Sequence, residues 1–515
     1  MRALYSFSLL AGGLLFSTHQ ACATEYEIKD LGDLGGSYIL PKAINSQGEI
    51  VGQATTAANS YDMFHYNGTM TNLSQQLGLG RGLATSTNNN GDIIGKAVFP
   101  SASAHDFFIS NDQGVTNLSE LIPEITNATN GQLGGINDDG VIVGAVGISD
   151  KSAFTLTPQI DGYELNYIGI VGKQNWGIAI NNNGQAVGFT RDDSGPSGDQ
   201  AFFFDGINSY EIGSLGGYSQ ATDINDSSAI VGHSFTGNQT LAFVYQQGSM
   251  TALGTIGGSS NQALGINNDG RIVGWAYNAS YKQRAVEFFD QSATDLNTLL
   301  PEGSPWVLNK AYGINDEGVI IGEGTYNGVK RAFVLSPINL PPVSNAGGPY
   351  QNFATVGIIF DATASTDPEG EPLTYSWDFG DGSISSEAVV EHAYTSAGTY
   401  TVILTVTDSK GQTHSDTTQA EIADHPPIAS AGLDKTVPAR TRVTLDGQGS
   451  LDPDGEIVSY QWQQLSGKKR LRGTYEGSML RFRSPSQAGD LVFELKVTDS
   501  LDQTSTDQVT ITVIR

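Results

Sequence analysis

The stretch Gly265-Ile266-Asn267-Asn268-Asp269-Gly270-Arg271-Ile272-Val273-Gly274 is the clearest copy of a phrase that recurs between residues 42 and 322. The phrase is an apolar residue, Asn, two polar residues, Gly and, after one further residue, an apolar pair followed by Gly. The other copies centre on Asn45, Asn88, Asn137, Asn181, Asn225 and Asn315. The six intervals from Asn45 to Asn315 cover 270 residues, a mean of 45. A period of this length is typical of a solenoid or a propeller.

Each copy predicts two short strands around a polar turn. Asn opens the turn, and the Gly three residues later can adopt the positive φ that a type I turn with a bulge requires. A third strand is marked by a small residue and Phe, as in Ala242-Phe243, and a fourth reads like residues 251–258. Four strands in about 45 residues fit one propeller blade.

The order of the strand types favours a closed ring. Residues 26–36 match residues 210–217, which are a fourth strand, whereas the last copy stops after its third strand at residues 331–335. An open solenoid does not require this offset. In a closed ring, the first strand completes the last blade and covers edges that would otherwise be exposed. We therefore expect an all-β protein whose residues 24–337 form a seven-bladed β-propeller, with residues 25–34 paired to residues 330–335.

The sequence of the repeat resembles that of the HAF-repeat family of extracellular bacterial proteins, over roughly residues 25–337. The resemblance implies an extracellular location. It offers no catalytic residues that could be transferred to this chain.

The composition changes at the proline-rich stretch 337–342, which predicts an extended linker. The motif Ser376-Trp377-Asp378-Phe379-Gly380-Asp381-Gly382 and the closing strand 398–408 closely resemble the PKD domain. The resemblance implies an Ig-like β-sandwich over residues 338–423, with Trp377 in its core. Residues 424–515 repeat much of this pattern without the Phe-Gly-Asp-Gly turn, so they are expected to form a second, PKD-like Ig-like β-sandwich.

The N-terminus has the features of a cleaved signal peptide over residues 1–23: Arg2, an apolar stretch from Leu9 to Phe16, and the small residues Ala21-Cys22-Ala23. A lipoprotein that uses Cys22 is the less favoured alternative, because the preceding residues lack a Leu-rich lead. The protein is therefore expected to be secreted to the extracellular space or the periplasm, with no membrane span. The net charge of −28 argues against nucleic acid and acidic membranes as partners.

Catalytic motifs are missing from the sequence. It contains no His-Glu-x-x-His metal motif and no Gly-x-Ser-x-Gly nucleophile motif, and its 54 acidic residues select no single catalytic pair. We therefore expect a non-enzymatic binding or adhesion protein for carbohydrate or an extracellular protein, with no required cofactor. The alternative is an extracellular polysaccharide-degrading enzyme, a lyase or a glycosidase, with its site in the propeller channel and the sandwiches as substrate anchors. The sequence leaves the oligomeric state open.

Binding is expected on the propeller face that carries the loops after each second strand, because those loops vary most between copies. Exposed aromatic rings on a concave surface suit sugar rings or peptide side chains. Packing between blades is the alternative role for the tryptophans. The candidate ligand-binding residues are Trp176, Trp275, Trp306, Arg191 and His233.

Calcium is a possible ligand of the sandwich domains, because Asp-Pro-Glu-Gly and Asp-Pro-Asp-Gly loops offer the carboxylate oxygens that this ion prefers. The alternative is that these loops are Asx turns. The blade turns are less suitable, because their charge is not kept from copy to copy. The candidate calcium ligands are Asp367, Glu369, Asp378, Asp452 and Asp454. The basic cluster at 468–472 is interpreted as a solvated hairpin, with contact to an anionic partner as the alternative.

Overall fold

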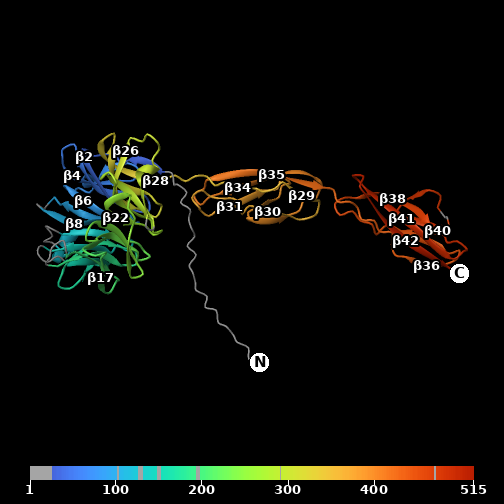
Figure 1. Ribbon diagram of the computed structural model, residues 1–515, viewed down its shortest axis with the longest axis horizontal. Helices are drawn as coiled ribbons and strands as arrows, with labels where there is room; N and C mark the ends of the chain where they lie inside the picture. The colour runs from blue at the N-terminus through green and yellow to red at the C-terminus, as the bar shows by residue number, and fades with distance from the viewer. Residues whose placement is uncertain are drawn as a thin grey trace, which may run out of the picture. The chain divides into compact units, whose positions relative to one another are not determined.

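The computed structural model describes residues 26–100, 104–125, 131–147, 152–192, 198–289, 292–468 and 471–515. The expected signal peptide lies outside these residues. The chain divides into two units, residues 23–338 and residues 339–515, and both are built from β-strands (Figure 1). No helix in the described part of the chain is long and apolar enough to span a bilayer. The helical turns are α1 (Leu73–Gln76), α2 (Leu118–Leu121), η1 (Pro123–Ile125) and η3 (Leu296–Leu299).

The described residues of the first unit form seven antiparallel sheets of four strands each. The first strands are β2 (Gly35–Ile44), β6 (Gly82–Thr87), β10 (Gln132–Ile136), β14 (Gln174–Ile180), β18 (Ser219–Ile224), β22 (Gly257–Ile266) and β26 (Trp306–Ile314). The second strands are β3 (Ile50–Thr56), β7 (Ile93–Val98), β11 (Ile142–Val146), β15 (Ala186–Arg191), β19 (Ile230–Phe235), β23 (Ile272–Asn278) and β27 (Ile320–Tyr326). The third strands are β4 (Tyr61–Tyr66), β8 (His105–Asn111), β12 (Ser152–Gln159), β16 (Gln200–Phe204), β20 (Thr240–Gln246), β24 (Gln283–Phe289) and β28 (Val329–Pro337). The fourth strands are β5 (Met70–Asn72), β9 (Gly114–Asn117), β13 (Gly162–Ile168), β17 (Ser209–Gly213), β21 (Ser249–Ala252), β25 (Ser292–Asp295) and, from the start of the chain, β1 (Tyr26–Asp30).

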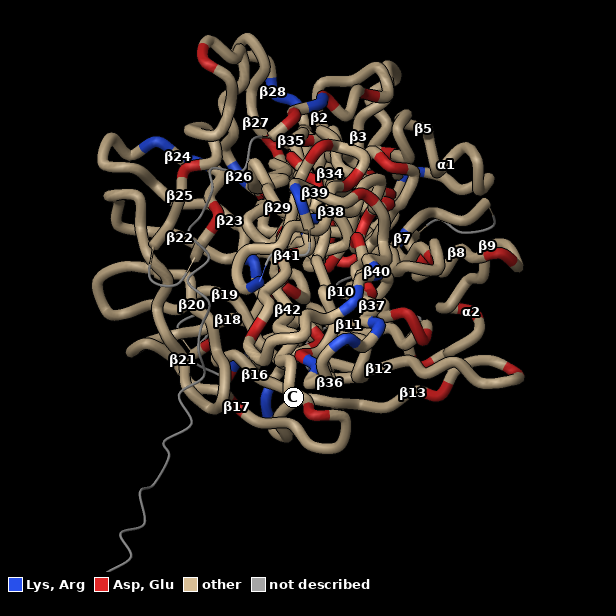
Figure 2. Tube along the Cα trace, turned by 90° about the vertical axis from the view of Figure 1, so that its right-hand side faces the viewer, with Lys and Arg blue, Asp and Glu red and all other residues tan. Residues whose placement is uncertain are grey.

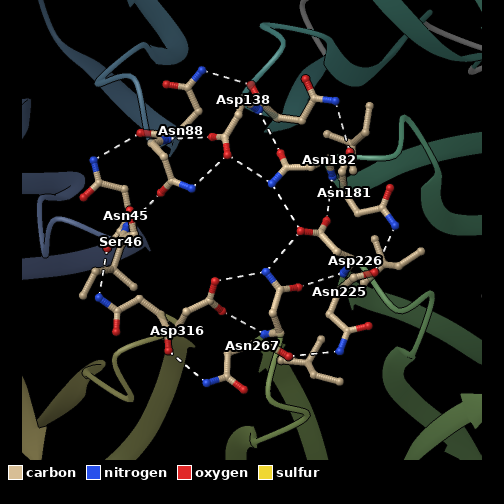
Figure 3. Close-up of a pocket in the computed structure, with 18 of the residues that line it drawn as sticks. Asn45, Ser46, Asn88, Asp138, Asn181, Asn182, Asn225, Asp226, Asn267 and Asp316 are labelled. Atoms are coloured by element: carbon tan, nitrogen blue, oxygen red, sulfur yellow. Dashed lines mark hydrogen bonds between the residues drawn. The ribbon is translucent and has the colours of Figure 1, made fainter. Parts of the chain in front are cut away.

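The repeated asparagines link the seven sheets into a closed circle of hydrogen bonds, which we call the asparagine ring (Figure 3). Each side-chain amide donates to the backbone carbonyl of the asparagine in the next sheet, at 2.9–3.1 Å. Asn315 donates to the carbonyl of Asn45 at 3.0 Å and closes the circle. Each Oδ1 accepts the N–H group four residues later and holds its own turn. Asparagine recurs because this position needs a donor and an acceptor on one short side chain.

The repeated glycine and phenylalanine explain each other. A Cβ atom on the glycine of each second strand would lie only 1.7–2.6 Å from a carbonyl oxygen of the first strand. In six sheets it would also lie within 3.0 Å of the third-strand Phe ring, as at Gly232 beneath Phe243. These phenylalanines are fully buried. The motif is therefore a packing requirement between three adjacent strands.

The seventh sheet is completed by the first strand of the chain. β1 pairs antiparallel with β28, from Tyr26 opposite Pro337 to Asp30 opposite Phe333. The expected pairing of the chain ends is confirmed, although the partner residues are 333–337 and not 330–335. Tyr26 is buried and accepts a hydrogen bond from Arg271 of the sixth sheet.

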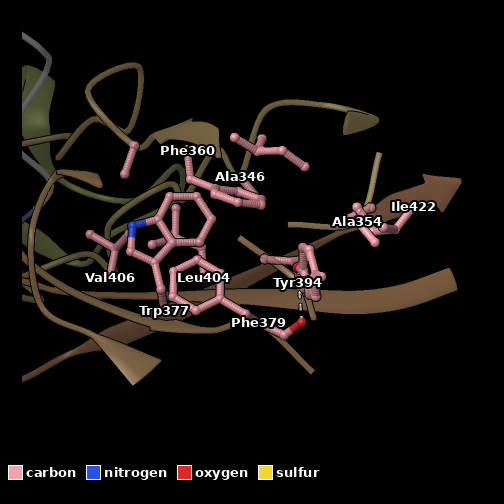
Figure 4. Packing of buried hydrophobic residues seen from close by; sticks show 13 residues of the cluster. Ala346, Ala354, Phe360, Trp377, Phe379, Tyr394, Leu404, Val406 and Ile422 are labelled. Carbon is pink, nitrogen blue, oxygen red and sulfur yellow. Dashed lines mark hydrogen bonds between the residues drawn. The ribbon is translucent and has the colours of Figure 1, made fainter. Parts of the chain in front are cut away.

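The second unit contains two β-sandwiches with the same strand order. In residues 339–423 a five-stranded sheet, β29-β35-β34-β31-β32, faces the pair β30-β33. These strands are β29 (Tyr350–Phe353), β30 (Ile358–Asp361), β31 (Thr374–Asp378), β32 (Ile384–Ser385), β33 (Val389–His392), β34 (Gly398–Thr407) and β35 (Thr413–Ala423). Figure 4 shows Trp377 beside Phe360 and Phe379 in the core, and its side chain is fully buried, as expected.

The second sandwich has the sheet order β36-β42-β41-β38-β39 with the pair β37-β40. Its strands are β36 (Lys435–Pro438), β37 (Arg442–Asp446), β38 (Ile457–Ser466), β39 (Thr474–Glu476), β40 (Met479–Arg483), β41 (Gly489–Asp499) and β42 (Thr504–Ile514). Trp462 occupies the place of Trp377 and is fully buried. The expected Ig-like sandwiches are therefore present in both halves of this unit.

Acidic residues outnumber basic ones along the chain, 54 to 26, and Figure 2 shows them as the more frequent red segments. The long-range field is consequently negative and disfavours polyanionic ligands.

Candidate functional site

A cavity of about 610 Å³ lies between the fourth sheet, β14–β17, and the fifth sheet, β18–β21. We call it the inter-sheet cleft. It lies at the strand ends that are remote from the turns at Asn181 and Asn225, because β15 and β19 run from those turns towards it. Its volume is within the range of small-molecule sites, about 300–1,000 Å³. The lining residues are Arg191, Asp199, Gly216, Gly217, Tyr218, Gln220, His233, Phe235 and Gly237.

An ion pair between a partly exposed arginine and a buried aspartate lines the inter-sheet cleft. Arg191 donates from Nε and Nη2 to the two carboxylate oxygens of Asp199, at 2.6 and 2.9 Å. Gln220 on the fifth sheet donates to Asp199 at 2.6 Å. Asp199 is completely buried. Its carboxylate thus joins the two sheets and fixes the guanidinium in place.

A histidine without a partner lines the same cleft. His233 is 9% exposed, and its Nδ1 atom has no hydrogen-bond partner. Burial lowers the pKa of His233 to about 4, although the nearby Asp199 carboxylate acts in the opposite direction. The imidazole is therefore neutral near pH 7 and can accept or donate a hydrogen bond at Nδ1, depending on its tautomer.

Two aromatic rings also line the cleft. Tyr218 and Phe235 are stacked, with ring centroids 5.5 Å apart and an interplanar angle of 4°. The Tyr218 hydroxyl is hydrogen-bonded to Thr240 at 3.0 Å. The lining residues at positions 216, 217 and 237 are glycines, and a Cβ at Gly217 would lie only 3.0 Å from the Phe235 ring.

The structure places Trp176, Arg191 and His233 together at this location. Arg191 lies over the Trp176 ring at 4.8 Å and over the Phe189 ring at 5.7 Å, and these two rings are stacked 4.6 Å apart. Trp176 is buried by these neighbours, so it supports Arg191 and presents no exposed ring face.

Trp275 and Trp306 lie on the sixth and seventh sheets, away from the inter-sheet cleft. Trp306 is buried against Tyr326 and Phe333 of its own sheet. The Trp275 indole donates to Gln262 at 3.2 Å. Trp306 has the packing role that was the alternative for the tryptophans, because its neighbours leave only 7% of its surface exposed.

The sequence did not single out Asp199, Tyr218, Gln220 or Phe235. The repeat varies at one position of the cleft, but this position is that of His233, which was already a candidate, and it indicates none of these four residues. The residue after each second-strand glycine differs in every sheet, whereas the glycine is kept. Those residues are Gln53, Lys96, Ala145, Phe189, His233, Trp275 and Glu323. The loop residues 193–197 that follow Arg191 lie outside the described residues.

The asparagine ring encloses a smaller cavity of about 160 Å³ (Figure 3). Asp138 and Asp226 both accept from the Asn182 amide, at 3.0 and 3.3 Å. Asn268 donates likewise to Asp226 and Asp316, at 3.1 and 3.0 Å. The carboxylates that line this cavity already accept hydrogen bonds from amides. This agrees with the interpretation of these turns as structural.

Each sandwich contains a cluster of polar side chains at the end of its closing strand. In the first sandwich, Asn339 donates to Asp408 at 2.8 Å, and the backbone N–H of Leu340 donates to Glu369 at 3.2 Å. The oxygens Asn339 Oδ1 and Asp367 Oδ2 are buried without partners. Burial raises the pKa of Glu369, and the neighbouring Asp367 carboxylate adds to the effect.

The second sandwich repeats this cluster with more charge. Gln503 donates to Asp424 at 2.8 Å, and the N–H of His425 donates to Asp454 at 3.0 Å. Asp454 Oδ1 and Asp499 Oδ2 are buried without partners. Burial raises the pKa values of Asp424 and Asp452, and the adjacent carboxylates act in the same direction.

The clusters include four of the five predicted calcium ligands and leave out Asp378. This residue pairs with Ile403, whereas Thr374 pairs with Thr407 beside Asp408. Four residues of strand separate the two places by about 13 Å. The sequence reasoning missed Asn339, Asp408, Asp424 and Asp499. Across the described residues, no three His, Cys, Asp or Glu side chains form a ready-made metal site, so a cation would need amide, backbone or water oxygens as well.

Comparison with known proteins identifies the second unit. Residues 339–423 match the PKD domain family, and residues 431–513 match the PKD domain of KIAA0319-like proteins. The rat dyslexia-associated protein KIAA0319 homolog is 35% identical over 207 residues, which are 37% of this chain and 19% of that protein. The pre-pro-metalloprotease PrtV of Vibrio cholerae is 33% identical over 188 residues, 36% of this chain and 19% of that protein. The chain thus spans about a fifth of the length of the curated relatives it matches.

Among solved structures, the PKD1 domain of Vibrio anguillarum Epp is 40% identical and covers 17% of this chain and 100% of its own, with a TM-score of 0.15. The two family matches show that the C-terminal region contains two PKD domains.

Proposed function

We propose that this chain is an exported binding protein, in which residues 24–337 form a seven-bladed β-propeller that recognises a carbohydrate or an extracellular protein. The asparagine ring and the β1–β28 pairing support the propeller, and the resemblance of the repeat to the HAF-repeat family agrees with it. The two PKD domains favour an extracellular setting and carry the propeller as a stalk. Residues 1–23 are proposed to be the signal peptide that directs export.

The inter-sheet cleft is the observation that carries the binding function. It combines an unfilled cavity, a stacked aromatic pair and a buried imidazole nitrogen without a partner. Among its described lining residues Asp199 is the one carboxylate, and Arg191 and Gln220 already occupy it. The described part of the lining does not include the paired carboxylates that a glycosidase uses, so we favour binding over hydrolysis at this place.

Loss of the aromatic wall should abolish retention of the ligand. The full chain should be tested for retention on immobilised extracellular polysaccharides and matrix proteins. Tyr218→Ala should lower the retained fraction at least tenfold, because it removes one ring of the stacked pair. Tyr167→Ala, an exposed tyrosine of β13 in the third sheet, is the matched control and should bind normally. Equal retention of both variants, with unchanged melting temperatures, would refute a binding role for the cleft.

We further propose that the two clusters of the PKD domains bind calcium through Asp367 and Glu369 in the first domain and Asp452 and Asp454 in the second. The four buried oxygens without partners support this, because an ion would satisfy oxygens that otherwise lose hydration at a cost. Asn339, Asp408, Asp424 and Asp499 are the additional donors that each cluster offers.

Saturating calcium should raise the melting temperature of the PKD domains in the full chain and leave the seven-sheet unit unchanged. At a hundredfold excess over Kd the free energy of unfolding rises by about 2.7 kcal/mol. The double variant Asp367→Asn with Asp452→Asn should lose the shift, whereas Asp378→Asn should keep it. Differential scanning calorimetry with calcium and with a chelator measures both. If a chelator leaves the melting temperature of the PKD domains in the native chain unchanged, the calcium assignment is wrong.

The calcium effect should also depend on pH. Without metal, the raised pKa values of Asp424 and Asp452 mean that these acids destabilise the fold at neutral pH, and this loss is relieved as pH falls and they take up protons. Calcium competes with those protons. The gap between calcium-loaded and chelated melting temperatures should therefore narrow from pH 7 towards pH 4.

A further inference from the structure

The charges of the inter-sheet cleft cancel one another. Among its described lining residues, Arg191 is the cation and Asp199 is the anion, and they are joined by two hydrogen bonds of 2.6 and 2.9 Å. Asp199 has no exposed surface. An acidic ligand would have to displace this internal carboxylate and leave it buried without its cation, which is costly. The cleft is therefore poorly suited to a carboxylate or a sulfate ester.

The polar atom of the cleft that has no partner is uncharged and buried. His233 Nδ1 has no partner, while the ring itself is nine-tenths buried. Its ring lies nearly perpendicular to that of Tyr218, with ring centroids 6.2 Å apart at an interplanar angle of 79°. A hydroxyl group is the best match, because it can donate to or accept from Nδ1 whichever tautomer is present.

The remaining surface is apolar and open. Tyr218 and Phe235 form a parallel stack beside Gly217 and Gly237. A Cβ at Gly237 would meet nothing within 4 Å, so the lining is open at this position. A sugar ring has a face of C–H groups that packs on aromatic rings and a rim of hydroxyl groups that form hydrogen bonds.

We propose that the inter-sheet cleft binds a neutral, hydroxyl-rich sugar ring, with His233 Nδ1 bonded to a sugar hydroxyl and the Tyr218–Phe235 wall against the C–H face. The proposal rests on the binding function proposed above and narrows it to one class of ligand. Arg191 and Asp199 shape the cleft and orient Gln220 without contributing net charge.

Calorimetric titration of the full chain with neutral oligosaccharides of glucose, mannose, galactose and N-acetylglucosamine, and with the corresponding uronate oligosaccharides, tests the ligand class. At least one neutral series should bind, and its uronate counterpart should bind at least tenfold more weakly. Equal or tighter binding of the uronate would overturn the proposal, as would a peptide ligand that occupies the cleft while no sugar binds.

Three variants test the role of His233. His233→Phe keeps the ring and removes Nδ1, and it should weaken neutral-sugar binding about tenfold, the effect of one hydrogen bond. His233→Asn keeps a polar atom at the δ position and should retain binding within about threefold. His65→Phe makes the same change in β4 of the first sheet and should bind as the native chain does. Native affinity in His233→Phe, with an unchanged melting temperature, would overturn the proposal.

The outcomes separate this proposal from the broader one. If Tyr218→Ala abolishes retention of an acidic polysaccharide or a protein, the cleft is a binding site and the neutral-sugar assignment is wrong. If Tyr218→Ala changes no retention at all, both proposals fail.

Discussion

A chain that lacks residues 24–36 should unfold its seven-sheet unit at temperatures where a chain that begins at residue 24 remains folded. The deletion removes β1, the fourth strand of the seventh sheet, and exposes the edge of β28. Tyr26 and Leu31 are 3% and 2% exposed. Burial of two such side chains contributes about 3–6 kcal/mol, against a typical total of about 5–15 kcal/mol.

Calorimetry of the two chains measures this effect, and the PKD transitions serve as an internal reference. Arg271 adds to the expected loss, because its bond to the Tyr26 hydroxyl links the sixth sheet to the first strand of the chain. The chain that begins at residue 24 keeps every described residue and should melt like the full protein. Identical melting of the shortened chain would show that ring closure does not depend on β1.

Gly188→Ala should destabilise the fourth sheet by about 3 kcal/mol. A Cβ there would lie 1.7 Å from the Trp176 carbonyl oxygen and 3.0 Å from the Phe202 ring, so the strands must move apart. Denaturant unfolding measures the change.

The matched control for this prediction is Gly313→Ala in the first strand of the seventh sheet. Its Cβ would meet Ile321 at an ordinary 3.7 Å, so the change should alter stability by less than about 1 kcal/mol. Comparable loss in both variants would contradict the packing explanation of the repeated glycine.

The internal repeat made the sheets and the pairing of the chain ends predictable. Seven copies act as an internal alignment, in which a position kept in every copy has a structural role. Asn45 and its counterparts hold the turns and link the sheets, and Gly52 and five of its six counterparts lie beneath a buried Phe ring. The offset between the first and last strands indicated the β1–β28 pairing from the order of the strand types alone.

The candidate site was less predictable, because it depends on contacts between sheets. Asp199 meets Gln220 across 21 positions of sequence, and neither belongs to the repeated phrase. Tryptophan was expected to mark exposed binding surface, but Trp176 and Trp306 are buried by neighbours that sequence spacing does not reveal. Asp378 was grouped with Asp367 by motif, whereas the pairing of β31 with β34 separates them along the strand. Comparison of the two PKD domains would have found Asp408 and Asp499, since each follows a threonine at the end of a closing strand.

Hydrogen–deuterium exchange of the full chain, with and without the polysaccharide or protein that it retains, tests the binding account most directly. Ligand should slow exchange in residues 216–220 and 233–237, which line the inter-sheet cleft, and leave the turns of the asparagine ring unchanged. Protection confined to residues 339–515, or to the turns of the asparagine ring, would contradict the account and place recognition elsewhere on the chain.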